Sequence, residues 1–302
     1  MVSTLMNRER VLIIGSTGML GQALSKTLSK HHVTHWGIAR KNTELCIDIT
    51  DKTALRNTIS QLNPTIIINA AALTDLHYCE DKPLLAYDIN ARAAGHLANI
   101  CQENAIYLIH ISTDHFYLDT HLKHSELDPI TLVNEYAKTK YLGECLASLN
   151  PASLIIRTNI VGFRHWGSNQ LTFVESIIDK FSKNEHFNLF YDYYTSSIDV
   201  YSFSNILLDL SQIRASGIFN VGCNDIFSKK QFIIAFADKF NLVLKSMTDV
   251  SVNSFLSVKR ATNLGLDVSK AETLLGYSFP KLDTVLSNLF SEYVLRETNS
   301  YV

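Results

Sequence analysis

Three glycines that follow an apolar segment near the N-terminus restrict the fold more than any other feature of this chain. Residues 11–14 are apolar, and Gly15, Gly18 and Gly21 follow with GxxGxxG spacing, where a helix over residues 18–30 is predicted to begin. Gly15 suits a tight turn, Gly18 lets the backbone approach a pyrophosphate, and Gly21 lets the helix pack closely against a sheet. Unpaired N–H groups at the start of such a helix favour negative charge. The pattern predicts a dinucleotide-binding loop made of Gly15, Ser16, Thr17, Gly18, Met19, Leu20 and Gly21.

Apolar strands and amphipathic helices alternate through the first half of the chain. Strands are predicted at residues 11–14, 33–38, 45–47, 65–69, 106–111 and 153–156, and helices at 18–30, 51–62, 84–101 and 135–147. Such alternation is typical of a parallel sheet with helices on both faces. Right-handed crossovers then give a doubly wound α/β sheet of the Rossmann type.

The alternation becomes less regular after residue 158. Further helices are predicted at residues 171–181, 202–210, 229–240 and 282–294, with one more sheet strand at 217–221. We expect residues 1–158, completed by about 199–222, to form the dinucleotide-binding domain. Residues 159–198 and 223–302 are then expected to form a smaller C-terminal α/β substrate-binding domain.

Composition excludes several classes of protein. The formal net charge of −2 leaves no broad basic surface, so neither nucleic acid nor an anionic membrane is an expected partner. The first ten residues lack the apolar core of a signal peptide, and the longest apolar stretch, residues 65–73, is too short to span a bilayer. We therefore expect a cytoplasmic protein.

Cysteine and histidine spacing predicts no metal site. The five cysteines include no CxxC pair, and their odd number indicates neither a disulfide framework nor a zinc site. The closest histidines, His31, His32 and His35 in one group and His121 and His124 in another, lie in polar segments without carboxylates at metal-motif spacing. We expect these histidines to be solvated loop residues.

The end of the second predicted strand indicates the choice of cofactor. An acidic residue there would bind the 2′-hydroxyl of NAD, whereas Arg40 and Lys41 suit the 2′-phosphate of NADP. The alternative is an exposed loop with two basic residues. We expect NADP(H) to be preferred, with NAD(H) as the second candidate. Asp48 and Ile49 are expected near the adenine, and three small residues are expected beside the cofactor: Ala70, Ala71 and Ala72.

Tyr136, Lys140 and Thr113 form the candidate catalytic group. Tyr136 and Lys140 are four residues apart, so they share one face of the helix predicted at 135–147. Thr113 follows the fifth strand, at the sheet edge where ligands bind in such folds. Reduction of a carbonyl needs a proton donor and a group that polarises the oxygen, and we expect the ammonium of Lys140 to lower the pKa of Tyr136.

Several segments together resemble one enzyme family. They cover nearly the whole chain: residues 15–21, 63–72, 112–114, 134–140 with 143–144, 157–158, and 259–267 with 269–270. Through them the chain resembles the extended short-chain dehydrogenase/reductases and, within these, the dTDP-4-dehydrorhamnose reductase family. The resemblance implies NADP(H)-dependent reduction of the keto group of a nucleotide-linked deoxy-sugar, a role in surface polysaccharide biosynthesis, and a homodimer. It also implies that Tyr136 is the proton donor, that Lys140 holds the nicotinamide ribose, and that Thr113 tunes the carbonyl.

Two departures from the family pattern concern the substrate. His115 and Phe116 stand where the family commonly has an aromatic pair, and Asn159 and Ile160 stand where rhamnose-forming enzymes usually carry tryptophan. These differences leave open another nucleotide-linked keto-sugar. Residues 192–198 are expected to line the same site by their position in the family, although their two tyrosines equally fit core packing. The expected substrate-binding residues are Thr113, Asp114, His115 and Asn159.

Two other functions remain open on the sequence. A nucleotide-sugar dehydratase of this superfamily uses an Asp-Glu pair after the threonine, and here His115 follows Asp114. An epimerase usually selects NAD, which Arg40 disfavours. Some relatives are regulatory subunits that bind dinucleotide without known turnover, and intact Tyr136 and Lys140 argue against that reading.

Overall fold

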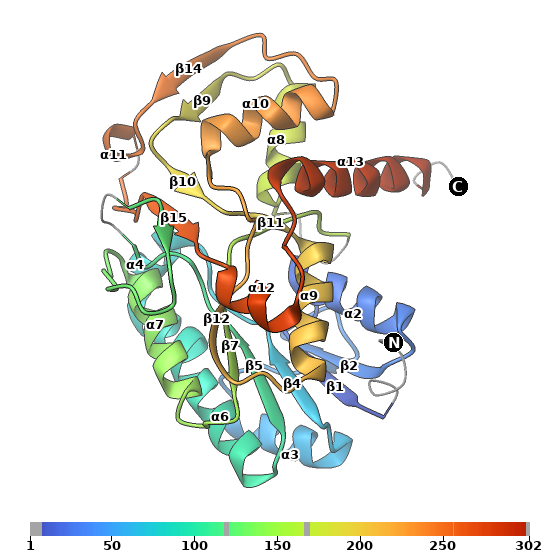
Figure 1. Ribbon diagram of the computed structural model, residues 1–302. Coiled ribbons are helices and arrows are strands. Elements are labelled where there is room, and N and C mark those ends of the chain that lie inside the picture. Colours follow the sequence, from blue (N-terminus) through green and yellow to red (C-terminus); the bar gives the residue numbers. More distant parts are fainter. Residues whose placement is uncertain (1–7, 118–120, 166–169, 256, 300–302) are drawn as a thin grey trace.

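The computed structural model describes residues 8–117, 121–165, 170–255 and 257–299, and a seven-stranded parallel sheet lies at its centre (Figure 1). The strand order is β12-β7-β5-β4-β1-β2-β3, so the order reverses beside β1. The strands are β1 (Arg10–Ile14), β2 (Thr34–Ala39), β3 (Leu45–Cys46), β4 (Ile66–Asn69), β5 (Tyr107–Ile111), β7 (Leu154–Arg157) and β12 (Gly217–Asn220). The predicted doubly wound α/β fold is confirmed.

Alternate residues of β1 enter two separate hydrophobic cores because neighbouring strand side chains point to opposite faces. Val11 and Ile13 join the core that contains side chains of α2 (Met19–Lys30), α9 (Val200–Gln212) and α12 (Ser269–Leu275). Leu12 and Ile14 join the core of α3 (Lys52–Leu62) and α6 (Ala93–Glu103). All four strand residues are fully buried, so both faces of the sheet are covered, as Figure 1 shows.

The long helix expected at residues 84–101 is interrupted, which corrects the prediction. Helix α5 (Pro83–Tyr87) leads into a π-helical segment, η1 (Asp88–Arg92), before α6 begins. At this point the backbone lies against α7 (Glu135–Ala147), where a Cβ added to Gly143 would lie 2.1 Å from the carbonyl O of Asn90. Close packing against α7 therefore coincides with the irregular turn, and π-turns of this kind are common at functional sites.

The start of α7 is fixed by Asn134, whose side chain makes two hydrogen bonds. Its Oδ1 accepts from the N–H of Ala137 at 2.8 Å and caps the helix. Its Nδ2 donates to the carbonyl O of Lys259 at 3.0 Å, so a residue far along the chain contacts the same cap. A side-chain cap of this type contributes about 1 kcal/mol to helix stability.

An upper lobe lies above the sheet in Figure 1, formed by α8 (Phe173–Ser182), β9 (Phe187–Phe190), α10 (Lys229–Lys239), β14 (Met247–Val250) and α13 (Leu282–Asn299). Its hydrophobic core is rich in phenylalanine, including Phe232 and Phe236. Several short elements were not predicted: α4 (Leu76–Asp81), β6 (Lys123–His124), β8 (Ile160–Val161), β10 (Tyr194–Thr195), β11 (Ile198–Asp199), β13 (Phe227–Ser228), α11 (Val252–Phe255) and β15 (Asn263–Leu266). Four of them form a second sheet, in the order β13-β10-β15-β6.

His124 corrects the expectation of solvated loop histidines. Its side chain is fully buried, and its ring stacks on that of Tyr117 with a centroid distance of 4.1 Å. Within the described residues, no three His, Cys, Asp or Glu side chains gather as they would around a metal ion. All five cysteines are free thiols. Across the same described ranges, no helix combines the length and apolar character needed to cross a membrane.

Candidate active site

The glycine loop connects β1 to α2 and leaves no space for side chains at two positions. Gly15 has a φ of +87°, and its N–H donates to the carbonyl O of Ile38 on β2 at 2.8 Å. A Cβ at Gly15 would lie 2.7 Å from the backbone N of Ala71, and a Cβ at Gly21 would lie 2.3 Å from the carbonyl O of Gly15. The loop is therefore pressed between two strands and its own helix, as expected for a turn that presents backbone to a phosphate.

A cavity of about 460 Å³ opens beside this loop. Nine of the predicted cofactor residues line it: Gly15, Thr17, Gly18, Arg40, Asp48, Ile49, Ala70, Ala71 and Ala72. Six other predicted cofactor residues do not line it: Ser16, Met19, Leu20, Gly21, Tyr136 and Lys140. Leu73, Ile89 and Arg164 line it without having been predicted. A larger cavity, of about 660 Å³, lies between α2, α9 and α13 and contains none of the predicted site residues.

Charged side chains border the cavity beyond β2 and β3. Arg40 directly follows β2, and its side chain is exposed, as is that of Lys41. Asp48 accepts hydrogen bonds from the backbone N and the hydroxyl of Thr50, at 2.9 and 2.7 Å. Partial burial opposes ionisation of Asp48, but the Thr50 hydrogen bonds and the charge of Arg40 outweigh it and lower its pKa. A cation and an anion thus stand at the same end of the cavity.

Thr113 and Tyr136 meet at the C-terminal end of β5. A hydrogen bond joins their side chains, although Thr113 follows a strand and Tyr136 lies in the first turn of α7. Tyr136 is 8% exposed and packs in a small apolar cluster with Leu73, which also lines the cavity. His115 contacts the ring of Tyr136 edge-on, with a centroid distance of 5.4 Å. The candidate proton donor is therefore shielded from water, and Leu73 connects its apolar cluster to the cavity.

Lys140 lies one turn after Tyr136 and is also buried. Its Nζ donates to the carbonyl O of Ile111, the last residue of β5, at 2.6 Å. Burial lowers the pKa of Lys140 to about 8, while the nearby charge of Glu144 opposes this change. The expected lowering of the Tyr136 pKa is not found. Burial raises the pKa of Tyr136, and the negative charge of Asp114 adds to the increase.

Asp114 begins a chain of buried polar groups. Its Oδ2 accepts from Asn159 Nδ2 at 2.9 Å, and Asn159 Oδ1 accepts from the hydroxyl of Ser197 at 2.7 Å. Burial raises the pKa of Asp114 to about 7, although Asn159 and Lys229 favour its charged form. Burial, together with the positive charges of Arg260 and Lys229, lowers the pKa of His115 to about 3, so its ring is neutral. The predicted substrate residues are thus brought together.

Three further residues lie beside Asp114 and His115, and none of them was predicted individually from the sequence: Tyr193, Lys229 and Arg260. Tyr193 is buried, its hydroxyl lies 3.5 Å from His115 Nε2, and a hydrogen bond links it to Arg260. Burial lowers the pKa of Lys229 to about 8, while Asp114 attracts its ammonium and Arg260 repels it. The segment 192–198 and the family segment that contains Arg260 were singled out in the sequence, but nothing there indicates that Lys229 lies beside Asp114.

Comparison with known proteins places this geometry in a family. A family model described as "RmlD substrate binding domain" matches residues 9–295. The chain belongs to this family. Its relatives include a Haloferax volcanii protein described as a probable low-salt glycan biosynthesis reductase, which is 29% identical over 298 residues that cover 93% of this chain and 98% of the relative.

Other relatives differ in their described roles. Methionine adenosyltransferase 2 subunit beta from Mus musculus is 27% identical over 279 residues, or 88% of this chain and 82% of that protein. The structure of a dTDP-4-dehydrorhamnose reductase from Bacillus anthracis in complex with NADP has a TM-score of 0.85 at 25% identity, covering 94% and 99% of the two chains. The predicted family and the class of NAD(P)-dependent oxidoreductases are confirmed.

Proposed function

We propose that the protein reduces the keto group of a nucleotide-linked deoxy-sugar with NADPH, in the manner of a dTDP-4-dehydrorhamnose reductase. The observation that carries the proposal is that one residue, Leu73, is shared by the cavity at the glycine loop and by the apolar cluster of Tyr136. The cavity volume of about 460 Å³ is within the range of ligand pockets in proteins.

The residues of this chain fit a dinucleotide. Added Cβ atoms at Gly15 and Gly21 would meet backbone at 2.7 and 2.3 Å, so a side chain at either position would displace the loop, and the loop lines the cavity through Gly15, Thr17 and Gly18. Gly15, Thr17 and Gly18 would hold the pyrophosphate, and Asp48 and the small residues after β4 would contact the rest of the molecule. When bound, the cofactor supplies the hydride.

Arg40 supports a preference for NADPH over NADH. Its exposed guanidinium follows β2 and lines the cavity, where a 2′-phosphate would accept paired hydrogen bonds from it. Lys41 adds a second positive charge at the same rim. Arg164 reaches the cavity from the segment after β8 and adds a third.

Three side chains have separate roles in the reduction: Tyr136, Thr113 and Lys140. Tyr136 donates a proton to the reduced carbonyl oxygen, and its burial keeps the hydroxyl protonated until that oxygen gains negative charge. Thr113 donates a hydrogen bond to the same oxygen and polarises it. Lys140 binds the nicotinamide ribose and, as an ammonium, favours the phenolate that remains after proton transfer.

Lys229 and Arg260 support an anionic substrate. They approach the buried group of Asp114 and His115 from the upper lobe and from the segment before β15. Burial disfavours the charged form of Asp114, so these two cations lack a full counter-charge within the group. A diphosphate between nucleoside and sugar supplies such a charge. Asp114, His115 and Asn159 would then contact the sugar.

We also propose the domain division expected from the sequence. Residues 1–158, with about 199–222, would bind the cofactor, since they contribute all seven strands of the central sheet. Residues 159–198 and 223–302 would bind the substrate. Limited proteolysis with and without NADPH tests this division, because cleavage inside residues 8–117 should be suppressed by the dinucleotide.

A binding-only role is the second candidate, because mammalian relatives are described as subunits of an adenosyltransferase. The two roles are separated by one pair of measurements. Thermal shift with NADPH reports binding, and loss of NADPH absorbance with dTDP-4-dehydrorhamnose or another nucleotide-linked keto-sugar reports turnover. Stabilisation with turnover supports the reductase. Stabilisation without turnover across a panel of keto-sugars supports the binding role, and no stabilisation contradicts both.

A further inference from the structure

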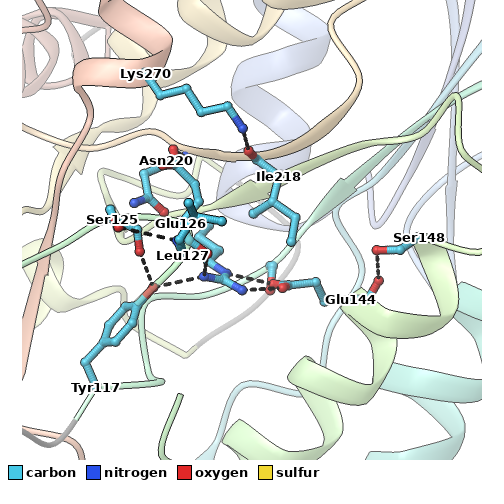
Figure 2. Close-up of polar contacts among 11 residues, drawn as sticks. Tyr117, Ser125, Glu126, Leu127, Glu144, Ser148, Ile218, Asn220 and Lys270 are labelled. Atoms are coloured by element: carbon cyan, nitrogen blue, oxygen red, sulfur yellow. Dashed lines mark hydrogen bonds and ion pairs between the residues drawn. The ribbon is translucent and has the colours of Figure 1, made fainter. Parts of the chain in front are cut away.

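A buried ion pair joins α7 to β7 beside the candidate catalytic group. Arg157 Nη2 and Nε donate to Glu144 Oε1 and Oε2, at 2.6 and 3.1 Å, and each side chain is 2% exposed. Arg157 also donates to the hydroxyl of Tyr117 at 2.9 Å and to the carbonyl O of Glu126 at 3.2 Å. Figure 2 shows Glu144 reaching the centre of this network from its helix, with Tyr117 on the opposite side. Two-point contact holds the carboxylate in one orientation.

Glu144 also connects the helix to the end of β5. Its Oε2 accepts from the hydroxyl of Ser112 at 2.9 Å, and Ser112 directly precedes Thr113. The N–H of Ser112 donates to the carbonyl O of Ile156 on β7 at 2.7 Å. One carboxylate therefore links the three elements that carry Tyr136 and Lys140, Thr113, and Asn159.

The charge of Glu144 acts on Lys140. Glu144 lies four residues after Lys140, so both side chains are on one face of α7. Tyr136 shares that helix, His110 faces Lys140 from β5, and Arg157 holds Glu144 from β7. Burial, together with the charge of Lys140, lowers the pKa of His110, so that ring is neutral. Glu144 is the negative group that opposes the effect of burial on the pKa of Lys140.

We propose that Glu144 is a positioning residue for this reaction: it holds α7 against the end of β5, and its negative charge keeps Lys140 protonated. Arg157 orients Glu144 and compensates its charge where water is excluded. The inference rests on the proposed function for its catalytic meaning. The effect on Lys140 itself is measurable without cofactor or substrate.

The first test is Glu144→Gln, which keeps the size of the side chain and its acceptor for Ser112 but removes the charge. Loss of a neighbouring opposite charge should lower the pKa of Lys140 by about one unit. The alkaline decline of kcat should move to lower pH by about that amount, while the Kd for NADPH at pH 6 stays as in the wild type. Glu126→Gln is the matched control, because the Glu126 carboxylate accepts from the N–H of Asn220 at 2.8 Å, on the other side of Arg157. Its pH profile should be unchanged.

A second readout uses the free protein. A lysine with a lowered pKa makes stability rise with pH between its folded and unfolded pKa values, since the unfolded state binds more protons there. For Lys140 this rise begins near pH 8 and should begin about one unit lower in Glu144→Gln. Lys229 titrates near the same pH, so the contribution of Lys140 is taken as the difference from each protein carrying Lys140→Met.

Glu144→Gln leaves Arg157 buried without its counter-charge and could misfold, so a second variant removes both charges. Glu144→Leu combined with Arg157→Met replaces the pair by apolar side chains, a change that buried ion pairs often tolerate. The double variant should fold, and its pH profiles should shift less than those of Glu144→Gln, because the positive charge of Arg157 is removed together with the negative charge of Glu144. Unchanged profiles in folded Glu144→Gln would overturn the proposal. If the stability profile shifts but no variant and no wild-type protein turns over a keto-sugar, the effect of Glu144 on Lys140 stands and the proposed function fails.

Discussion

Replacing Gly21 by alanine tests whether the glycine loop must be pressed against its helix to bind cofactor. The new Cβ would lie 2.3 Å from the carbonyl O of Gly15 and 2.6 Å from the Cα of Ser16. Both are backbone atoms that cannot rotate away, so an ordinary contact near 3.4 Å requires the loop or the helix to move by about 1 Å. Overpacking of this kind costs about 1–3 kcal/mol. If the loop moves, the Kd for NADPH should rise about 5- to 150-fold.

Two other glycines are the controls for that experiment. A Cβ at Gly18 would lie 3.3 Å from the carbonyl O of Gly15, so Gly18→Ala should leave Tm nearly unchanged yet weaken NADPH, because the methyl group occupies the approach to the pyrophosphate. Gly95, in α6, would meet only the side chain of Leu146 at 3.4 Å. Gly95→Ala should therefore bind NADPH normally and be at least as stable as the wild type.

Calorimetric titration with NADPH and thermal unfolding of the three variants separate binding from stability. The expected order of NADPH affinity is Gly95→Ala first and Gly21→Ala last, and Gly21→Ala alone should also lose Tm. Wild-type affinity and wild-type Tm in Gly21→Ala would refute the reasoning, because the contact with Gly15 would then be relieved at no cost. Loss of affinity in Gly95→Ala would show that the assay reports general damage.

Other predictions concern single side chains. Tyr136→Phe should lower kcat by about 10²- to 10⁴-fold with the Kd for NADPH unchanged. Tyr141→Phe, on the same helix, is the control and should be active. Turnover that survives in Tyr136→Phe would show that Tyr136 is not the proton donor. Arg40→Ala should weaken NADPH about 10- to 100-fold more than NADH, the value of a charge-assisted hydrogen bond, and equal weakening would contradict the cofactor preference. Arg260→Ala should raise KM for the nucleotide-sugar more than it changes kcat. The neighbouring side chain of Lys259 is exposed, so Lys259→Ala should leave both constants unchanged. A normal KM in Arg260→Ala would argue against the diphosphate contact.

The central sheet was predictable because its signals are local. Each buried strand is a short apolar run, and helix α7 begins and ends where the spacing predicts, with Asn134 as its cap. The glycine loop combines a strand, a turn and a helix within about a dozen residues, so one stretch of sequence contains the signal for the dinucleotide-binding loop. Tyr136 and Lys140 were found for the same reason, since both lie within one turn of a single helix.

The rest depends on contacts between distant segments. Lys229 and Asp114 are more than a hundred residues apart in the sequence, and no sequence pattern indicates that their side chains interact. The π-helical segment at Asp88–Arg92 follows no residue pattern, because it forms where the backbone packs against Gly143. His124 looked like a solvated residue in a polar stretch, yet it is buried against Tyr117. The raised pKa of Tyr136 likewise reflects burial, which the positive charge beside it in sequence does not reveal.

The two hydrogen bonds of Asn134 connect the beginning of α7 to the segment before β15. One end of a single amide holds the first turn that carries Tyr136, and the other end holds the carbonyl of Lys259, the residue before Arg260. In the proposed function, Arg260 contacts the diphosphate and Tyr136 donates the proton, so the side chain of Asn134 connects the segments that carry these two residues. If binding of the diphosphate at Arg260 helps to place the hydroxyl of Tyr136, a substrate without the diphosphate should lose rate as well as affinity.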